Sequence, residues 1–123
     1  MNNQDKKFSI SRRIKSFSFA FKGILFAFKT QHNLRIHVLA VILVITAGFI
    51  FKINPVEWAL IVFAIGMVLV SELFNTTVEY LVDFISPGYS KKAGVIKDLA
   101  AGAVLIAAVI SVIIGLIVFL PKI

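Results

Sequence analysis

Polar side chains recur on one face of a long and otherwise apolar segment. Within the run SELFNTTVEYLVD, the spacing i, i+3, i+4, i+7 and i+11 relates Glu72, Asn75, Thr76, Glu79 and Asp83. At about 100° per residue these positions share one side of an α-helix, while the opposite side stays apolar. The sequence therefore predicts a helix that carries three carboxylates and an amide in one polar stripe.

The chemistry of such a stripe depends on what surrounds it. In a membrane helix each carboxylate costs at least ~2.5 kcal/mol at the bilayer centre, and aligned carboxylates repel one another unless protonated, paired or bound to cations. Carboxylate and amide oxygens are the hard ligands that Mg²⁺ prefers, and one carboxylate would remain as a general base. A solvated helix end, or pairing with nearby basic residues, would explain the stripe without any function.

Three lysines follow the stripe in the segment SPGYSKKAGVIKD, residues 86–98. Their charge would meet a polyphosphate, with Mg²⁺ bridging phosphate and carboxylate oxygens. The Walker A spacing G-x-x-x-x-G-K-[ST] is absent, so spacing alone is weak support for a nucleotide. Lys91 and Lys92 are accounted for as topology signals, whereas Lys97 and Asp98, entering the last helix, are less easily dismissed.

Two histidines are further acid–base candidates. His37 stands at the edge of an apolar run, where it could act as a base or a ligand. A hydrogen-bonding residue at the membrane interface is the commoner use of such a histidine, and we favour that interpretation. No Ser/His/Asp set accompanies Ser71.

The elements that position these residues belong to a membrane protein. The 123 residues are 59% hydrophobic and only 15% charged, with a net charge of +7 and a mean hydropathy of +0.97. A water-soluble domain carries roughly 25% charged residues. Disorder and nucleic-acid binding are excluded too, because the basic residues sit among long apolar runs. The absence of cysteine removes disulfides, thiolate metal sites and cysteine nucleophiles.

Residues 8–30 predict an amphipathic helix. Its apolar stripe consists of Ile10, Ile14, Phe17, Phe21, Ile24 and Phe28, and a second stripe consists of Lys15, Lys22 and Lys29. An apolar side beside a basic side suits a helix lying in the interface of an anionic leaflet. A helix that packs on the protein core and exposes its lysines is the alternative.

Three further segments predict membrane-spanning helices, at residues 34–53, 56–85 and 99–120. The last has 22 uncharged residues in a row, enough to cross a hydrocarbon core of roughly 30 Å. The fold class is therefore all-α integral membrane, with one interfacial helix and three spans in a single domain, residues 1–123.

The distribution of Lys and Arg predicts the orientation. Eight lie in residues 1–37 and three between the second and third spans, whereas the turn between the first two spans has only Lys52 and the C-terminal tail only Lys122. The positive-inside rule then places the N-terminus and the 86–98 segment in the cytoplasm and the C-terminus outside.

The motifs also resemble those of a known family. The run from Glu72 to Asp83 fits E-x-x-N-[ST]-x-[IV]-E-x-x-[VI]-D, and GVIKDLAAGAV at residues 94–104 supplies a Lys-Asp pair. This pattern is similar to that of the prokaryotic diacylglycerol kinase family, over nearly the whole chain. NLRIH at 33–37 and IIGLIVFLPK at 113–122 are similar to its undecaprenol kinase branch of Gram-positive bacteria.

The resemblance implies a homotrimeric enzyme of the bacterial plasma membrane, surrounded by membrane lipids, that transfers the γ-phosphoryl group of Mg-ATP to a lipid alcohol. It implies that Glu72 is the general base and Glu79 the metal-binding carboxylate. Asn75 and Asp83 match polar residues that support the site.

The nucleotide contacts are implied in the same way. Lys97 and Asp98 match a nucleotide-binding pair, with Lys97 at the phosphates. Arg12 matches an arginine on the interfacial helix that contacts nucleotide or lipid. The nucleotide-contacting loop corresponds to Gly88, Tyr89 and Ser90.

One position departs from the family pattern. Gln31, within Thr30-Gln31-His32-Asn33, stands where the family has a glutamate that binds metal. A glutamine carbonyl can coordinate Mg²⁺ but brings no charge. We therefore expect weaker metal affinity or a slower rate.

Several functions remain open at this stage. The favoured acceptor is undecaprenol, giving undecaprenyl phosphate, and the alternative acceptor is diacylglycerol, giving phosphatidate. A cation- or proton-conducting subunit with Glu72 and Glu79 on the path, or a non-catalytic adaptor, belongs to another class. The basic cytoplasmic segment beside the carboxylates favours a kinase.

Overall fold

A computed structural model of the chain describes residues 9–123. Within them, four α-helices are followed by a short 3-10 turn: α1 (Ile10–Thr30), α2 (His32–Ile50), α3 (Pro55–Ile85), α4 (Lys91–Phe119) and η2 (Leu120–Lys122). No strand occurs in residues 9–123. The all-helical prediction is therefore confirmed for this part of the chain, and the expected helix start at residue 8 lies outside the described residues.

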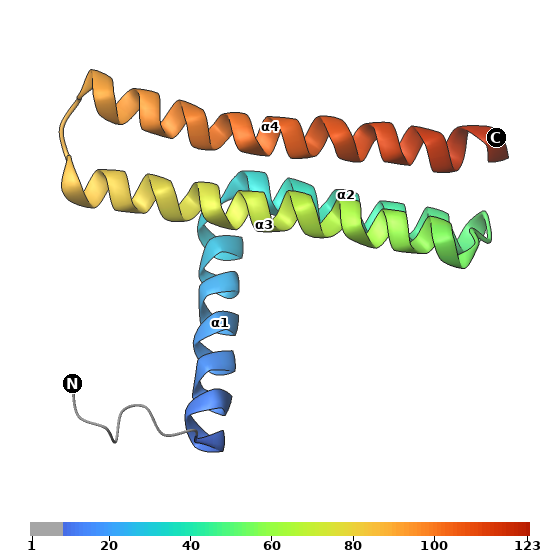
Figure 1. Ribbon diagram of the computed structural model, residues 1–123, viewed down its shortest axis with the longest axis horizontal. Coiled ribbons are helices and arrows are strands. Elements are labelled where there is room, and N and C mark those ends of the chain that lie inside the picture. Colours follow the sequence, from blue (N-terminus) through green and yellow to red (C-terminus); the bar gives the residue numbers. More distant parts are fainter. Residues whose placement is uncertain (1–8) are drawn as a thin grey trace.

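Three of the helices are long and apolar enough to cross a membrane, namely His32–Ile50, Pro55–Ile85 and the continuous Lys91–Lys122. They lie side by side, and α1 runs crosswise to them (Figure 1). The prediction of three candidate spans is therefore confirmed.

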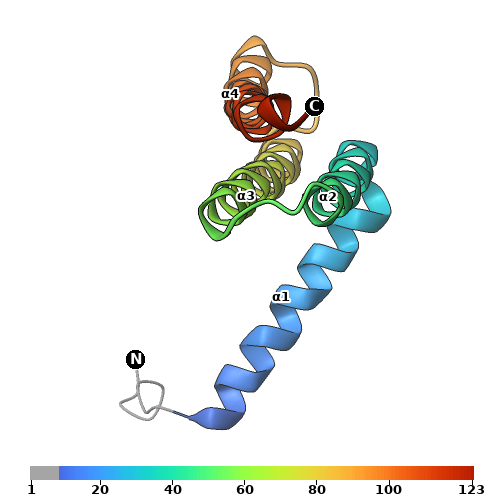
Figure 2. The ribbon, with the colours of Figure 1, turned by 90° about the vertical axis from the view of Figure 1, so that its right-hand side faces the viewer.

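The helix α3 is central to the bundle. It packs against α4 along much of its length and also against α2, whereas α2 and α4 do not pack directly on each other. The end-on view shows α2 and α4 at different sides of α3 (Figure 2). Within the described residues α3 thus joins α2 and α4, which do not close the bundle against each other.

Few apolar side chains are buried within a single chain. The buried cluster of Ile53, Ile61 and Val118 lies at the end of the bundle that holds the α2–α3 turn. Large apolar side chains elsewhere face outward, as Phe63 does at 65% exposed. Outward-facing apolar residues are what lipid or neighbouring subunits would cover.

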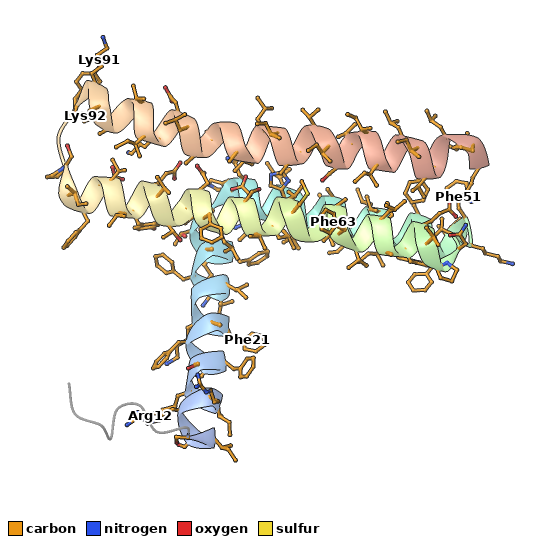
Figure 3. All side chains as sticks on the ribbon, viewed as in Figure 1. Arg12, Phe21, Phe51, Phe63, Lys91 and Lys92 are labelled. Carbon is orange, nitrogen blue, oxygen red and sulfur yellow. The ribbon has the colours of Figure 1, made fainter. Side chains whose placement is uncertain are left out.

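The apolar stripe of α1 is exposed as well. Phe17 and Phe21 are each 68% exposed, and Ala27 is the one buried residue of this helix. Figure 3 shows Phe21 on the part of α1 that extends away from the other helices. The stripe is thus not packed on the core of its own chain.

Side-chain caps set where the helices begin. The Ser9 hydroxyl accepts a hydrogen bond from the Arg12 amide. Asn54 and Glu57 form a reciprocal capping box ahead of α3, with Pro55 in the first turn. The Ser90 hydroxyl accepts from the Ala93 amide at 3.4 Å. Caps of this kind satisfy amides that have no partner inside the helix.

The start of α4 differs from the sequence-based expectation. The helix begins at Lys91 rather than at Leu99, because the Ser90 cap starts it before the uncharged run does. The uncharged run of residues 99–120 predicts only the part of the helix that lies in lipid. The helix itself can continue beyond that run into water. Lys97 and Asp98 consequently stand inside a helix and not at its first turn.

An elbow joins α1 to α2. Gln31 is extended between the two helices, with φ −112° and ψ 113°. The Arg35 side chain reaches back to α1, donating from Nε to the Phe28 carbonyl at 2.8 Å and from Nη2 to the Lys29 carbonyl. A guanidinium at a helix C-terminus satisfies carbonyls that lack partners, so Arg35 fixes the direction in which α1 leaves the bundle.

Candidate active site

Glu72 is buried near the middle of α3, where its carboxylate contacts one histidine. It is 3% exposed. Its Oε1 lies 3.1 Å from Nε2 of His37 on α2. A histidine with its hydrogen on Nε2 donates that hydrogen to the carboxylate. Glu72, the strongest acid–base candidate of the sequence, is thus paired with His37. The sequence favoured a hydrogen-bonding role at the membrane interface for this histidine.

The pair opens into a cavity of about 400 Å³ between α2, α3 and α4. Asn33, His37, Glu72 and Asn75 form its polar side. Ile36 and four small or apolar residues of α4 form the rest: Ala101, Val104, Leu105 and Ala108. A pocket with an apolar wall and a few convergent polar groups is typical of a substrate site.

Asn75 and Glu79 continue the polar stripe away from Glu72. Asn75 Nδ2 donates to Glu79 Oε1 at 3.5 Å. Asn75 Oδ1 is buried and has no hydrogen-bond partner. Buried polar atoms without partners are rare and call for a ligand or water.

These two side chains suit a hard divalent cation in part. An amide oxygen and a carboxylate oxygen are ligands of the type Mg²⁺ takes, and Mg²⁺ commonly keeps waters and substrate phosphates as further ligands. No group of three or more His, Cys, Asp or Glu side chains able to hold a metal gathers in residues 9–123. One chain thus supplies a partial ligand set that fits a cation shared with phosphate.

Asp83 ends the stripe in an ion pair. Its Oδ1 accepts from Nζ of Lys97 on α4 at 2.6 Å, and both side chains are substantially exposed. The stripe therefore runs from a buried carboxylate to a solvated one. The interpretation as pairing with nearby basic residues is right for Asp83, whereas Glu72 is buried beside a histidine.

The other predicted nucleotide contacts lie apart from Glu72 within one chain. Tyr89 is 98% exposed in the segment between α3 and α4, and Asp98 is exposed on α4. Gly88 is exposed and Ser90 caps α4. Lys91 and Lys92 lie at this same end of the bundle (Figure 3).

Gln31 and Arg12 are also outside the cavity. The backbone amide of Gln31 donates to Ala27 at the elbow, at 2.8 Å, and its side chain makes no capping hydrogen bond. Arg12 stands on the far part of α1 (Figure 3). The fold of one chain therefore gathers Glu72, Asn75 and Glu79, but leaves Gln31 and Arg12 elsewhere.

Asn33 and His37 line the cavity, although sequence reasoning did not consider Asn33 and favoured an interfacial role for His37. They are one helical turn apart on α2, so both face α3. The signal was present as a polar i, i+4 pair at the start of an apolar helix. Its partner on α3 is 35 positions away in the chain, and only the packing of α2 on α3 joins them.

A second, apolar groove of about 300 Å³ adjoins the polar cavity. It lies between α2 and α4 over α3, and His37 and Ala108 line both spaces. Ser111 closes part of it by donating to the Ala64 carbonyl at 3.1 Å. The polar cavity thus borders the apolar groove, and His37 lies at the boundary between them.

Comparison with known proteins adds the following similarities. A family model described as prokaryotic diacylglycerol kinase matches residues 18–119. The undecaprenol kinase of Bacillus subtilis (strain 168) is 40% identical over 122 residues, which cover 99% of each chain. A diacylglycerol kinase of Synechocystis is 39% identical over 107 residues, covering 86% of this chain and 61% of that protein. The diacylglycerol kinase of Escherichia coli (strain K12) is 28% identical over 103 residues, or 84% of each.

Proposed function

The chain belongs to the prokaryotic diacylglycerol kinase family, and on that premise we propose that it transfers the γ-phosphoryl group of Mg-ATP to the hydroxyl of undecaprenol. It is a lipid kinase of a membrane family. The observation that carries the acceptor is the 40% identity with an undecaprenol kinase over 99% of both chains. Diacylglycerol is the second candidate, because the Synechocystis relative of nearly equal identity carries that name.

The proposed site lies at the cytoplasmic edge of the membrane. Glu72 is about 26 Å along α3 from Pro55, at 1.5 Å per residue, which is close to the thickness of the hydrocarbon core. The crosswise helix α1 meets α3 further along, where the rings of Phe26 and Tyr80 pack at a tilt with their centres 5.5 Å apart. An α1 lying in the interface would place Glu72 just below the headgroups. Water-soluble ATP and a lipid hydroxyl can both reach that depth.

Glu72 is the proposed general base. Its carboxylate accepts the proton of the lipid hydroxyl as the hydroxyl oxygen bonds to the γ-phosphorus. The bond from that phosphorus to the β–γ bridging oxygen breaks, and ADP leaves. Phosphoryl transfer of this kind needs positioning and charge neutralisation more than covalent chemistry.

Lys97 is the proposed phosphate contact, with Asp98, Arg12 and the Gly88–Ser90 loop as further nucleotide contacts. Lys97 pairs with Asp83. Exposed ion pairs contribute little to stability, at most ~1 kcal/mol. Lys97 can therefore exchange this carboxylate for phosphate at low cost.

Asn75 and Glu79 are the residues that would hold Mg²⁺, with Gln31 as a weaker, uncharged candidate. Two observations support this assignment: Asn75 Oδ1 is buried without a hydrogen-bond partner, and the same amide donates from Nδ2 to the Glu79 carboxylate. When bound, Mg²⁺ would neutralise phosphate charge at the site.

A homotrimer is the proposed assembly, with the site completed across subunits. The outward-facing apolar side chains of the three long helices and the exposed stripe of α1 leave large apolar surfaces uncovered. Arg12 and Gln31 lie outside the Glu72 cavity of their own chain. In a trimer, a neighbouring copy would bring its own Arg12 and Gln31 to that cavity.

Radiolabelled ATP transfer onto undecaprenol and onto diacylglycerol, in lipid or detergent, tests the function. We expect incorporation into undecaprenol in preference. Replacement Glu72→Gln should lower turnover by roughly 10²- to 10⁴-fold, the usual contribution of a general base, with near-normal ATP affinity. The matched control is Glu57→Gln, the same change at the far end of α3, where Glu57 pairs with Lys122.

The outcomes separate the possibilities. Substantial lipid phosphorylation by Glu72→Gln would remove Glu72 as the base. Preferred labelling of diacylglycerol would change the acceptor but not the reaction class. No transfer to either lipid by the unmodified chain would overturn the proposed function.

A further inference from the structure

The contact between His37 and Glu72 joins two helices inside the proposed site. Glu72 Oε1 and His37 Nε2 are 3.1 Å apart, with the carboxylate almost wholly buried and the imidazole about one quarter exposed. A single buried hydrogen bond to a carboxylate fixes the direction in which its remaining lone pairs point. We propose that His37 is a positioning residue, which holds the Glu72 carboxylate toward the lipid hydroxyl. This inference rests on the proposed function.

No other ionisable side chain competes for this role among those lining the cavity. The polar residues there are Asn33, His37, Glu72 and Asn75, and the side chains from α4 are apolar. The stripe carboxylates Glu79 and Asp83 face Asn75 and Lys97 respectively. His37 is therefore the one titratable group of the described residues that is aimed at Glu72.

The location of His37 fits the acceptor. It lines both the polar cavity of about 400 Å³ and the apolar groove of about 300 Å³. A lipid alcohol with its chain in the groove and its hydroxyl in the cavity would present that hydroxyl beside the pair. With Oε1 held by the imidazole, Oε2 of Glu72 is the oxygen that remains for the hydroxyl proton.

Three variants test this positioning. His37→Leu removes the hydrogen bond and should lower kcat by roughly 10- to 100-fold, the effect of one hydrogen bond to a charged group. KM for ATP should stay within about threefold of its original value, because the change does not touch the proposed nucleotide contacts. His37→Gln keeps an amide donor near the Nε2 position and should restore most of kcat. The matched control is His32→Leu at the exposed start of α2, which should leave kcat unchanged.

A spectroscopic readout does not depend on activity. The chain has two histidines, so ¹⁵N-histidine labelling of the full chain in nanodiscs gives two imidazole signatures. Glu72→Gln should shift the resonances of His37 and leave those of His32 in place. This readout also reports on the contact if His37→Leu lowers the yield of folded protein.

The kcat values of the His37 variants and the His37 resonances decide whether the positioning role holds. A normal kcat in His37→Leu, no rescue by His37→Gln, or unshifted His37 resonances in Glu72→Gln would each overturn the positioning role. If instead the unmodified chain transfers no phosphate while the His37 resonances do respond to Glu72→Gln, the proposed function has failed and the contact stands.

Discussion

Glu72 and Glu79 lie on one side of the same helix but meet different surroundings. Glu72 is buried against an imidazole, whereas Glu79 is half-buried beside the Asn75 amide. Carboxylates placed in unlike environments can take unlike roles, one for protons and one for a cation. The helical spacing in the sequence predicts that they share a face. It could not predict that His37 comes to Glu72, because that contact requires α2 to pack on α3.

The glutamine at position 31 offers a test at this scale. Gln31→Glu adds a negative oxygen ligand, so we expect the Mg²⁺ concentration for half-maximal rate to fall several-fold. The measurement is a Mg²⁺ titration of lipid phosphorylation at saturating ATP. Gln31→Leu, which removes the carbonyl, should shift the titration the other way. An unchanged or weaker dependence in Gln31→Glu would argue against a ligand role.

The helices themselves are defined by caps, apolar runs and a few close contacts. The apolar runs predict three candidate spans and their order along the chain, and the structure confirms three helices long and apolar enough to cross a membrane. They could not predict that α4 starts at Lys91, because hydropathy does not report where a helix passes from lipid into water. Ser90 was the local signal for that start.

Next to the turn that joins them, α2 and α3 make a contact that leaves no room for a side chain at Gly48. A Cβ at Gly48 would lie 2.6 Å from Cη2 of Trp58. The Trp58 ring also packs at a tilt against Phe49, with ring centres 4.9 Å apart. The lack of a side chain at Gly48 therefore lets the Trp58 indole pack against α2 at this end of the α2–α3 pair.

Gly48→Ala should consequently destabilise the protein by about 1–3 kcal/mol, the usual cost of overpacking. Thermal unfolding in detergent measures this. The matched control is Gly66→Ala, where a Cβ meets nothing within 4 Å and the gain in helix propensity is up to ~1 kcal/mol. Equal melting temperatures for the two variants would show that the Trp58 ring moves aside without loss of stability.

The whole molecule has two dissimilar ends. One carries the α3–α4 segment with Lys91 and Lys92, and the other carries the α2–α3 turn and the C-terminus (Figure 3). The unequal distribution of Lys and Arg predicts which end faces the cytoplasm. Assembly could not be predicted from charge, because the surfaces that a neighbouring copy would cover are as apolar as those that lipid would cover.

The absence of native cysteine makes orientation measurable. We expect a membrane-impermeant maleimide to label Ile123→Cys on intact cells and to leave Lys91→Cys unlabelled until the membrane is opened. Both positions are exposed, so access rather than burial decides the result. Labelling of Lys91→Cys alone on intact cells would reverse the proposed orientation.

The apolar groove between α2 and α4 determines which measure of acceptor concentration sets the reaction rate. Its lining residue Val112 is 62% exposed, so the groove opens to the outside of the chain. An acceptor that reaches Glu72 along this groove never leaves the bilayer, so its encounters with the enzyme are two-dimensional. The rate then follows the mole fraction of acceptor among the membrane lipids, and diluting it with inert lipid slows the reaction even when the amount per volume of sample stays constant.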